Sequence, residues 1–171
     1  ETVVAGSVRE LCAAAASACA ARGYAPEVID TAVADEARVA GRRLAEIVRA
    51  HATDGGRRAF IMGGETVVKL TGHGKGGRNQ EFALAAAPIL DGLSNVALIS
   101  VGSDGTDGPT DAAGGCVDGE TAAQLRARGL SVDRALAEND AYPTLASVGG
   151  LVVTGPTGTN VNDVAVGLID A

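Results

Sequence analysis

The sequence predicts an α/β domain, a three-layer sandwich in which a mixed, mostly parallel sheet has helices on both faces. Short apolar runs alternate with longer segments of helical periodicity, which is typical of this class. The run from Asn95 to Val101 is apolar throughout, as expected for a strand covered on both faces. Small residues at Gly63-Gly64 and at 155–160 suit hairpin connections, so part of the sheet is expected to be antiparallel.

Each element of the first half has a local signal. Ser7-Val8-Arg9-Glu10 has the spacing of a capping box and opens a helix that ends at Gly23. Apolar residues at helical spacing predict a second helix over 35–52, and a third runs from about Asn79 to Leu90. Strands are predicted over Glu1–Ala5, 26–29, 58–62 and 66–70, the last two joined by a tight turn at Gly63-Gly64.

The second half predicts a strand at 95–101 and then short helices. Asp118 is the expected N-cap of a helix that ends at Gly129. The remaining elements are helical turns over 131–137 and 139–147 and strands over 150–154 and 161–169, the two strands forming an antiparallel pair. We therefore interpret residues 1–171 as a single α/β domain.

The composition limits the classes of partner. The chain carries a net charge of −7, which argues against general binding of nucleic acid or anionic membranes. No apolar run is long enough to span a bilayer, and no signal peptide is recognised at the start. The three cysteines lack a C-x-x-C spacing, so we expect free thiols in a cytoplasmic protein. The oligomeric state is left open, with a homodimer as one alternative.

The stretch from Gly72 to Glu81 combines four glycines with basic and amide side chains, between a predicted strand and a predicted helix. Such a unit presents backbone N–H groups and a positive helix end to an anion. Lys75 and Arg78 add charge, and Arg78 can hold two oxygens through its fork. With Asn79 and Gln80, they are candidate phosphate or substrate contacts. The alternative is a flexible glycine turn with solvated side chains.

A second loop, 102–115, is acidic. Its aspartates, Asp104, Asp107 and Asp111, do not have the spacing of a calcium EF-hand. A magnesium ion needs only one or two carboxylates beside water and substrate phosphates, so Asp104 and Asp107 are its candidate ligands. Asp104 follows directly on the strand, where ligands bind in open α/β sheets, and is the candidate catalytic carboxylate with Arg78. The alternative is that these residues only form turns.

A third loop, 155–160, offers Thr157, Thr159 and Asn160 as hydrogen-bonding groups. If the basic, acidic and hydroxyl-bearing loops share one edge of the sheet, their chemistry suits phosphoryl transfer. Glu65 is either an exposed turn residue or a carboxylate that orients Arg78. These alternatives remain open at the level of sequence.

Several known signatures are absent. The sequence has no G-x-x-x-x-G-K-[ST] and no G-x-S-x-G, so it predicts neither a P-loop nor a nucleophile elbow. Gly72, Gly74 and Gly77 do match G-x-G-x-x-G, which is the basis for a nicotinamide-dependent reductase as the alternative function. No acidic residue stands at the position expected for a ribose contact.

Longer blocks of sequence carry a resemblance. The chain resembles the C-terminal domain, called MOFRL, of the glycerate 2-kinases, some of which were labelled hydroxypyruvate reductases. The similarity spans about residues 60–170. The matching blocks are Gly63–Thr66, Gly76–Glu81, Gly105–Gly114, Asn139–Tyr142 and Thr154–Asp163.

The resemblance implies ATP-dependent phosphorylation of D-glycerate to 2-phosphoglycerate, with magnesium. It implies an active site between this domain and an N-terminal Rossmann-like domain, which this chain lacks and which supplies a lysine. Arg78 corresponds to the arginine that lines the cleft. We expect the isolated domain to be inactive. A reductase, or a non-catalytic regulatory domain, remains the alternative.

Overall fold

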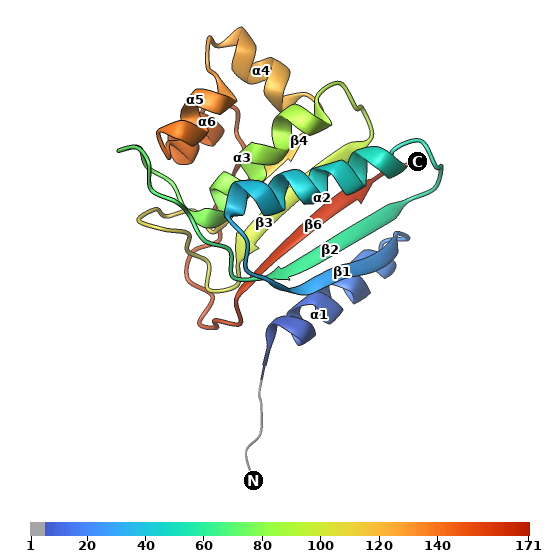
Figure 1. Ribbon diagram of the computed structural model, residues 1–171. Coiled ribbons are helices and arrows are strands. Elements are labelled where there is room, and N and C mark those ends of the chain that lie inside the picture. Colours follow the sequence, from blue (N-terminus) through green and yellow to red (C-terminus); the bar gives the residue numbers. More distant parts are fainter. Residues whose placement is uncertain (1–5) are drawn as a thin grey trace.

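The computed structural model describes residues 6–171, so the strand predicted over Glu1–Ala5 lies outside the described residues. The described chain forms a mixed sheet in the order β1-β2-β6-β3-β4-β5, flanked by helices (Figure 1). Its strands are β1 (Ala25–Val33), β2 (Arg58–Gly64), β3 (Val96–Gly102), β4 (Gly114–Asp118), β5 (Leu151–Val152) and β6 (Asp163–Ile169). Its helices are α1 (Val8–Ala20), α2 (Ala37–His51), α3 (Arg78–Leu90), α4 (Thr121–Ala127), α5 (Val132–Ala137) and α6 (Ala141–Ala146).

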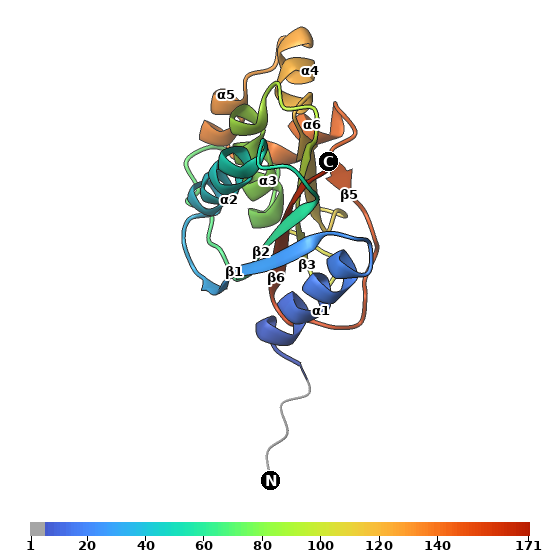
Figure 2. The ribbon, with the colours of Figure 1, turned by 90° about the vertical axis from the view of Figure 1, so that its right-hand side faces the viewer.

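The helices lie on both faces of the sheet, which confirms the predicted α/β class. Figure 2 shows the layers: α1 lies on one side of the strands, and α2 and α3 lie on the other. Strands β3 and β6 alternate between buried and half-buried residues, the buried ones being those toward α2 and α3. The region of strands β2, β6 and β3 is therefore the middle of the domain.

The expectation of a mostly parallel sheet is wrong. Of the described strands, only β1 and β2 pair in parallel. Strand β6 lies between β2 and β3 and runs antiparallel to both, and β4 is antiparallel to β3. The predicted hairpin between the last two strands is also wrong, because β5 pairs with β4. The chain returns across the sheet after β5, so β5 and β6, which are consecutive in sequence, do not pair with each other.

A second correction concerns residues 66–70, which form no strand. Gly63 and Gly64 belong to β2 instead of forming a turn, and the following segment makes one bridge, between Glu36 and Val67. Val67 and Leu70 face solvent, with exposed fractions of 58% and 80%, whereas Thr66 is buried. A pattern of β-branched residues produced the strand prediction, but no neighbouring strand is available to pair with the segment.

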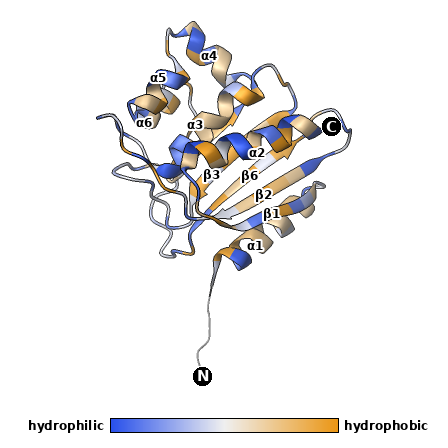
Figure 3. Ribbon diagram, in the orientation of Figure 1, coloured by the Kyte–Doolittle hydropathy of each residue, from blue (hydrophilic) through white to orange (hydrophobic). Residues whose placement is uncertain are grey.

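The helix pair α2 and α3 forms the main core with the sheet. Gly41 of α2 allows close contact, since a Cβ there would lie 2.1 Å from the carbonyl oxygen of Phe82. Leu44, Leu84 and Leu98 are fully buried in this cluster. Figure 3 shows the resulting polarity of α2, which carries both hydrophobic and hydrophilic residues along its length.

The strand register sets the position of the functional loops. Gly64, the last residue of β2, and Gly102, the last residue of β3, both pair with Asp163, the first residue of β6. The loops 65–77, 103–113 and 153–162 therefore all leave or enter the sheet at the same edge. This edge is the rim on which the candidate site lies.

Candidate functional site

The three predicted loops meet at this rim, which confirms their expected convergence. Arg78 opens α3 and contacts Asp163 at the start of β6. The acidic and hydroxyl-bearing loops are joined by the Thr157 backbone N–H, which donates to the carbonyl oxygen of Asp104 at 3.1 Å. The Thr157 hydroxyl also donates to the carbonyl oxygen of Ser103.

Arg78 is held by a carboxylate on each side. Its Nε donates to Oδ2 of Asp163 at 2.5 Å, and its Nη2 donates to Oδ1 at 3.0 Å. Its Nη1 lies 3.6 Å from Oε1 of Glu65. The hydrogen bonds that Arg78 donates to Asp163 raise the pKa of Arg78, and the charges of Asp163 and Glu65 raise it further. The guanidinium is therefore a permanent cation at the rim.

Asp104 lies beside this pair. A Cβ on Gly102 would lie 3.0 Å from Oδ1 of Asp104 and 3.4 Å from Oδ1 of Asp163, so both carboxylates border the space above that glycine. Oδ1 of Asp104 accepts a hydrogen bond from the backbone N–H of Thr106 at 2.9 Å. Its second oxygen has no hydrogen bond to a described residue, so it is available to a ligand.

Asp107 has a different environment. It is 3% exposed, and its carboxylate accepts hydrogen bonds from the backbone N–H groups of Asn79, at 3.1 Å, and Gln80, at 2.9 Å. Burial raises the pKa of Asp107 to about 6. The aspartate therefore binds the N-terminal amides of α3, which the sequence had predicted to bind a phosphate.

The side chains of Asn79 and Gln80 are also turned inward. They are 1% and 0% exposed, respectively. Asn79 accepts a hydrogen bond from the Ser100 hydroxyl at 2.6 Å, and Gln80 donates to Thr110 at 2.8 Å. This burial conflicts with the prediction that Asn79, Gln80 and Asp107 contact substrate or metal. In the structure, they support the end of α3 from within.

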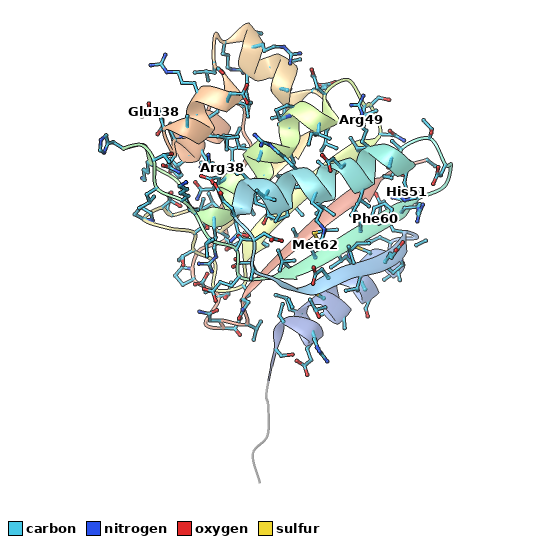
Figure 4. All side chains as sticks on the ribbon, in the orientation of Figure 1. Arg38, Arg49, His51, Phe60, Met62 and Glu138 are labelled. Atoms are coloured by element: carbon cyan, nitrogen blue, oxygen red, sulfur yellow. The ribbon has the colours of Figure 1, made fainter. Side chains whose placement is uncertain are left out.

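The glycines of the 72–77 loop are explained by protein contacts. A Cβ at Gly72 would lie 2.3 Å from Cα of Glu138, and one at Gly74 would lie 2.5 Å from Cβ of Asp140. Figure 4 shows Glu138 at the end of the domain where this loop projects. Lys75 stacks its Nζ 4.3 Å from the ring centre of Tyr142. The loop thus packs closely on the start of α6, and Lys75 is drawn to that helix.

An open hollow of about 920 Å³ lies beside Arg78. The segment from Glu65 to Gly77 forms one wall, and Gly108 and Pro109 also line the hollow. Thr159 and Asn160 are exposed on the third loop, where the Thr159 carbonyl accepts from the Thr157 hydroxyl at 3.4 Å. A small anionic molecule in the hollow could reach Arg78 from solvent.

Two residues that support the site were missed. Asn139 clamps the wall, since its Oδ1 accepts from the backbone N–H groups of Thr71, at 2.7 Å, and Gly72, at 2.9 Å. Asp163 holds Arg78. The signal for Asp163 was present in the sequence. It is a charged residue two positions before Ala165, and so lies on the same inward face of an apolar strand.

Residues 6–171 contain no group of three or more His, Cys, Asp or Glu side chains placed to hold a metal ion. The same residues contain no helix with the length and apolar character that crossing a membrane requires.

Several known proteins are similar to this chain in sequence and in fold. A D-glycerate 2-kinase from Thermotoga maritima is 50% identical over 168 residues, which cover 96% of this chain and 40% of the relative. A putative hydroxypyruvate reductase from Agrobacterium vitis is 40% identical over 91% of this chain and 42% of its own. A crystal structure of a Thermotoga maritima glycerate kinase superimposes with a TM-score of 0.96 at 48% identity, over 99% of this chain and 42% of that one.

The chain thus spans about two-fifths of the length of these relatives. Residues 58–163, more than half of the sequence, match the profile of one family. They include all three loops that meet at the rim, together with Arg78 and its partner Asp163. The chain belongs to the MOFRL family.

Proposed function

We propose that this chain is the C-terminal domain of an ATP-dependent glycerate 2-kinase, which phosphorylates D-glycerate to 2-phosphoglycerate. The observation that carries the proposal is Arg78, a cation fixed by Asp163 beside an open hollow. The names of the similar proteins supply the reaction class. The domain is inactive alone, because the remaining groups belong to an N-terminal Rossmann-like domain.

The residues of this chain act mainly by charge. Arg78 neutralises an oxyanion of glycerate or of the phosphoryl group in transfer, a stabilisation that a preorganised cation provides without rearrangement. Asp104 orients the glycerate hydroxyl or the ion that accompanies the nucleotide. Thr159 and Asn160 offer further donors on the third loop, which the Thr157 hydroxyl ties to Ser103. Lys75, placed over the Tyr142 ring, adds positive charge to the first loop, and Glu65 adds negative charge beside Arg78.

Asp104 fits a magnesium site and Asp107 does not. Asp104 has a carboxylate oxygen without a hydrogen bond to the described residues, whereas both oxygens of Asp107 accept from α3. Magnesium is typically held by one or two carboxylates, water and substrate phosphates, so one aspartate from this domain is sufficient. When bound, the ion would draw negative charge from the phosphate oxygens.

The reductase alternative loses support in the structure. The G-x-G-x-x-G of residues 72–77 is not preceded by a strand, and its first two glycines approach Glu138 and Asp140. The helix end that would bind a pyrophosphate is occupied by Asp107. A purely regulatory role is disfavoured by Arg78, whose half-buried cation is held at the border of the hollow. The free thiols of the described cysteines support a reducing, cytoplasmic setting.

A coupled assay of ADP release with D-glycerate tests the proposal. The 171-residue chain is expected to be inactive, and the same chain joined to an N-terminal domain of the kind found in its relatives is expected to be active. In the longer protein, Arg78→Ala should lower kcat/KM about 100-fold or more, as expected for loss of a preorganised charge. Arg42→Ala, on the exposed face of α2, is the control. Absence of glycerate-dependent ADP release from the longer protein would refute the kinase assignment.

A further inference from the structure

The nitrogens of Arg78 have unequal partners. Nε and Nη2 form a two-point contact with Asp163, with donor–acceptor distances of 2.5 and 3.0 Å. Nη1 has only a longer contact to Glu65, at 3.6 Å, which is an ion pair without a hydrogen bond. The fork that arginine usually offers to a phosphate or carboxylate is therefore already occupied, and Nη1 is the end that remains.

The two carboxylates also differ in their freedom to move. The Asp163 side chain is 9% exposed, and its backbone pairs with Gly64 on one side and Gly102 on the other. The Glu65 side chain is 62% exposed and lies on the loop that follows β2. One partner of Arg78 is thus fixed in the middle of the sheet, and the other can turn into solvent.

The charges around Arg78 favour an exchange in which an incoming anion replaces Glu65. Asp163, Glu65 and Asp107 all act on the guanidinium through their charges. An added anion would meet a site in which carboxylates outnumber the single arginine. If Glu65 leaves as the anion arrives, the local charge changes little and Nη1 keeps one partner throughout.

We propose that Asp163 is a positioning residue that fixes Arg78 through Nε and Nη2, and that Glu65 is a displaceable counter-ion on Nη1. The site then takes one oxyanion, a carboxylate or a phosphate, in exchange for Glu65. This inference rests on the proposed function, since it assigns the binding of the anionic group to the same arginine. It adds two residue roles to that function.

Asp163→Asn separates positioning from simple neutralisation. If Asp163 only reduced the charge of Arg78, the variant would bind anions more tightly. If it positions Arg78, inorganic phosphate should bind about tenfold more weakly, as expected when a charge-assisted two-point contact becomes a neutral one. Titration of the 171-residue chain with inorganic phosphate at low ionic strength measures the Kd. Asp30→Asn is the matched control, because Asp30 pairs with the exposed Arg43.

A spectroscopic readout accompanies the titration. The Arg78 Nε–H resonance in a ¹H–¹⁵N spectrum is expected to shift in Asp163→Asn and to stay nearly constant during titration of the parent chain with phosphate. If Asp163 contributed only packing, its carboxylate would not hold the Nε–H group, and the Nε–H resonance of the parent chain would shift when phosphate binds. Tighter or unchanged phosphate binding in Asp163→Asn would overturn the positioning role.

Glu65→Gln provides a variant with little risk to folding, because the side chain is exposed. Removal of the competing carboxylate should lower the Kd for phosphate about 2- to 5-fold, the range expected for an exposed ion pair. Glu27→Gln is the control, since Glu27 lies 3.3 Å from Arg58 with a 56% exposed side chain. Unchanged or weaker binding in Glu65→Gln would overturn the exchange.

A parallel titration with D-glycerate distinguishes the two sources of the oxyanion. Binding of phosphate but not glycerate assigns the site to the phosphoryl group, and the reverse assigns it to the substrate carboxylate. The kinase assay remains independent of these titrations. Loss of ADP release with intact anion exchange would reject the proposed function alone, whereas kinase activity without the Asp163 effect would reject this inference alone.

Discussion

Asp107 closes the N-terminus of α3, where its Oδ2 accepts a hydrogen bond from the backbone N–H of Gln80 at 2.9 Å. A phosphate-binding helix would leave this amide to its ligand. Here, a residue from the loop after β3 supplies the negative charge from within the protein. The contact ties the acidic loop to the start of α3 and so sets the position of Arg78, the first residue of that helix.

This cap predicts a pH dependence of stability. The pKa of Asp107 rises on folding from its ordinary 3.8 to about 6, because burial disfavours the charged form. Between these values the folded state binds more protons than the unfolded state, so the Asp107 contribution to the free energy of unfolding falls as pH rises. The loss amounts to about 3 kcal/mol. Above about pH 7 and below about pH 3.5 the contribution should be constant.

Urea denaturation of the parent chain and of Asp107→Asn between pH 4 and pH 7 measures this effect. Other acids titrate in the same range, so the relevant quantity is the difference in unfolding free energy between the two proteins. That difference should fall steadily toward neutral pH. A flat difference would show that Asp107 does not titrate as its burial implies.

Gly77 is required for the same cap. A Cβ at this position would lie 2.3 Å from Cγ of Asp107, in a contact that no side-chain rotation relieves without displacing the carboxylate. Gly77→Ala should therefore destabilise the chain by about 2 kcal/mol or more, the scale of a strained core substitution. Gly76→Ala is the control in the same loop, since a Cβ at Gly76 would lie 3.2 Å from its nearest neighbour, the Cβ of Ala141. Thermal unfolding of both variants compares them, and equal melting temperatures would contradict the prediction.

The features of this domain that depend on local sequence could be predicted, whereas those that depend on contacts between distant segments could not. Helices α2 and α3 could be predicted because their periodicity and ends are local properties of the sequence. The position of β6 between β2 and β3 could not, since strand pairing depends on contacts between distant segments. Strand β4 was missed because it is short and begins with two glycines.

The candidate site likewise has features that local sequence predicts and features that only the tertiary fold determines. Arg78 and Asp104 could be predicted from residue type and from their place beside an apolar strand or a helix. The inward position of Asp107 could not, because the partner of a loop carboxylate is fixed by the tertiary fold. The glycines at 72–77 were assigned to a ligand, although Gly72 and Gly74 approach residues 138–140 and Gly77 approaches Asp107. Sequence shows that a backbone must approach something closely, but not what it approaches.

A buried ion pair links α2 to α3 and underlies the hollow. Arg38 donates from Nε to Oε1 of Glu81 at 2.9 Å, and the Glu81 side chain is 3% exposed (Figure 4 labels Arg38 at the start of α2). The Arg38 side chain is itself only 17% exposed. Its removal would leave the Glu81 carboxylate buried with Asn139 as its remaining partner.

Arg38→Met should therefore destabilise the chain by about 3–5 kcal/mol, the usual cost of leaving a buried charge without its partner. Arg42→Met, on the exposed side of the same helix, should change stability by less than about 0.5 kcal/mol. Urea denaturation at pH 7 measures both. Adding Glu81→Gln to Arg38→Met should restore part of the lost stability, because it removes the unpaired charge. If the double variant is no more stable than Arg38→Met, the loss came from packing and not from the unpaired charge.

Asn139 controls the order of the wall beside Arg78. It has a φ of +54°, which asparagine tolerates better than most residues, and its amide bonds Thr71, Gly72 and the carbonyl oxygen of Lys69. The wall has no strand of its own to hold it. The backbone N–H groups of Thr71 and Gly72 therefore depend on this one side chain for their hydrogen bonds.

Asn139→Ala should increase the hydrogen-exchange rates of the Thr71 and Gly72 amides about tenfold or more, because each loses a hydrogen-bond acceptor whose net value is about 1 kcal/mol or more. Exchange followed by NMR at these two amides is the measurement. Asn162→Ala is the control for the backbone cost of alanine, since Asn162 also has a positive φ, of +70°. It should leave both amides protected. If Asn139→Ala leaves them protected as well, other contacts order the wall, and Asn139 serves only its own turn.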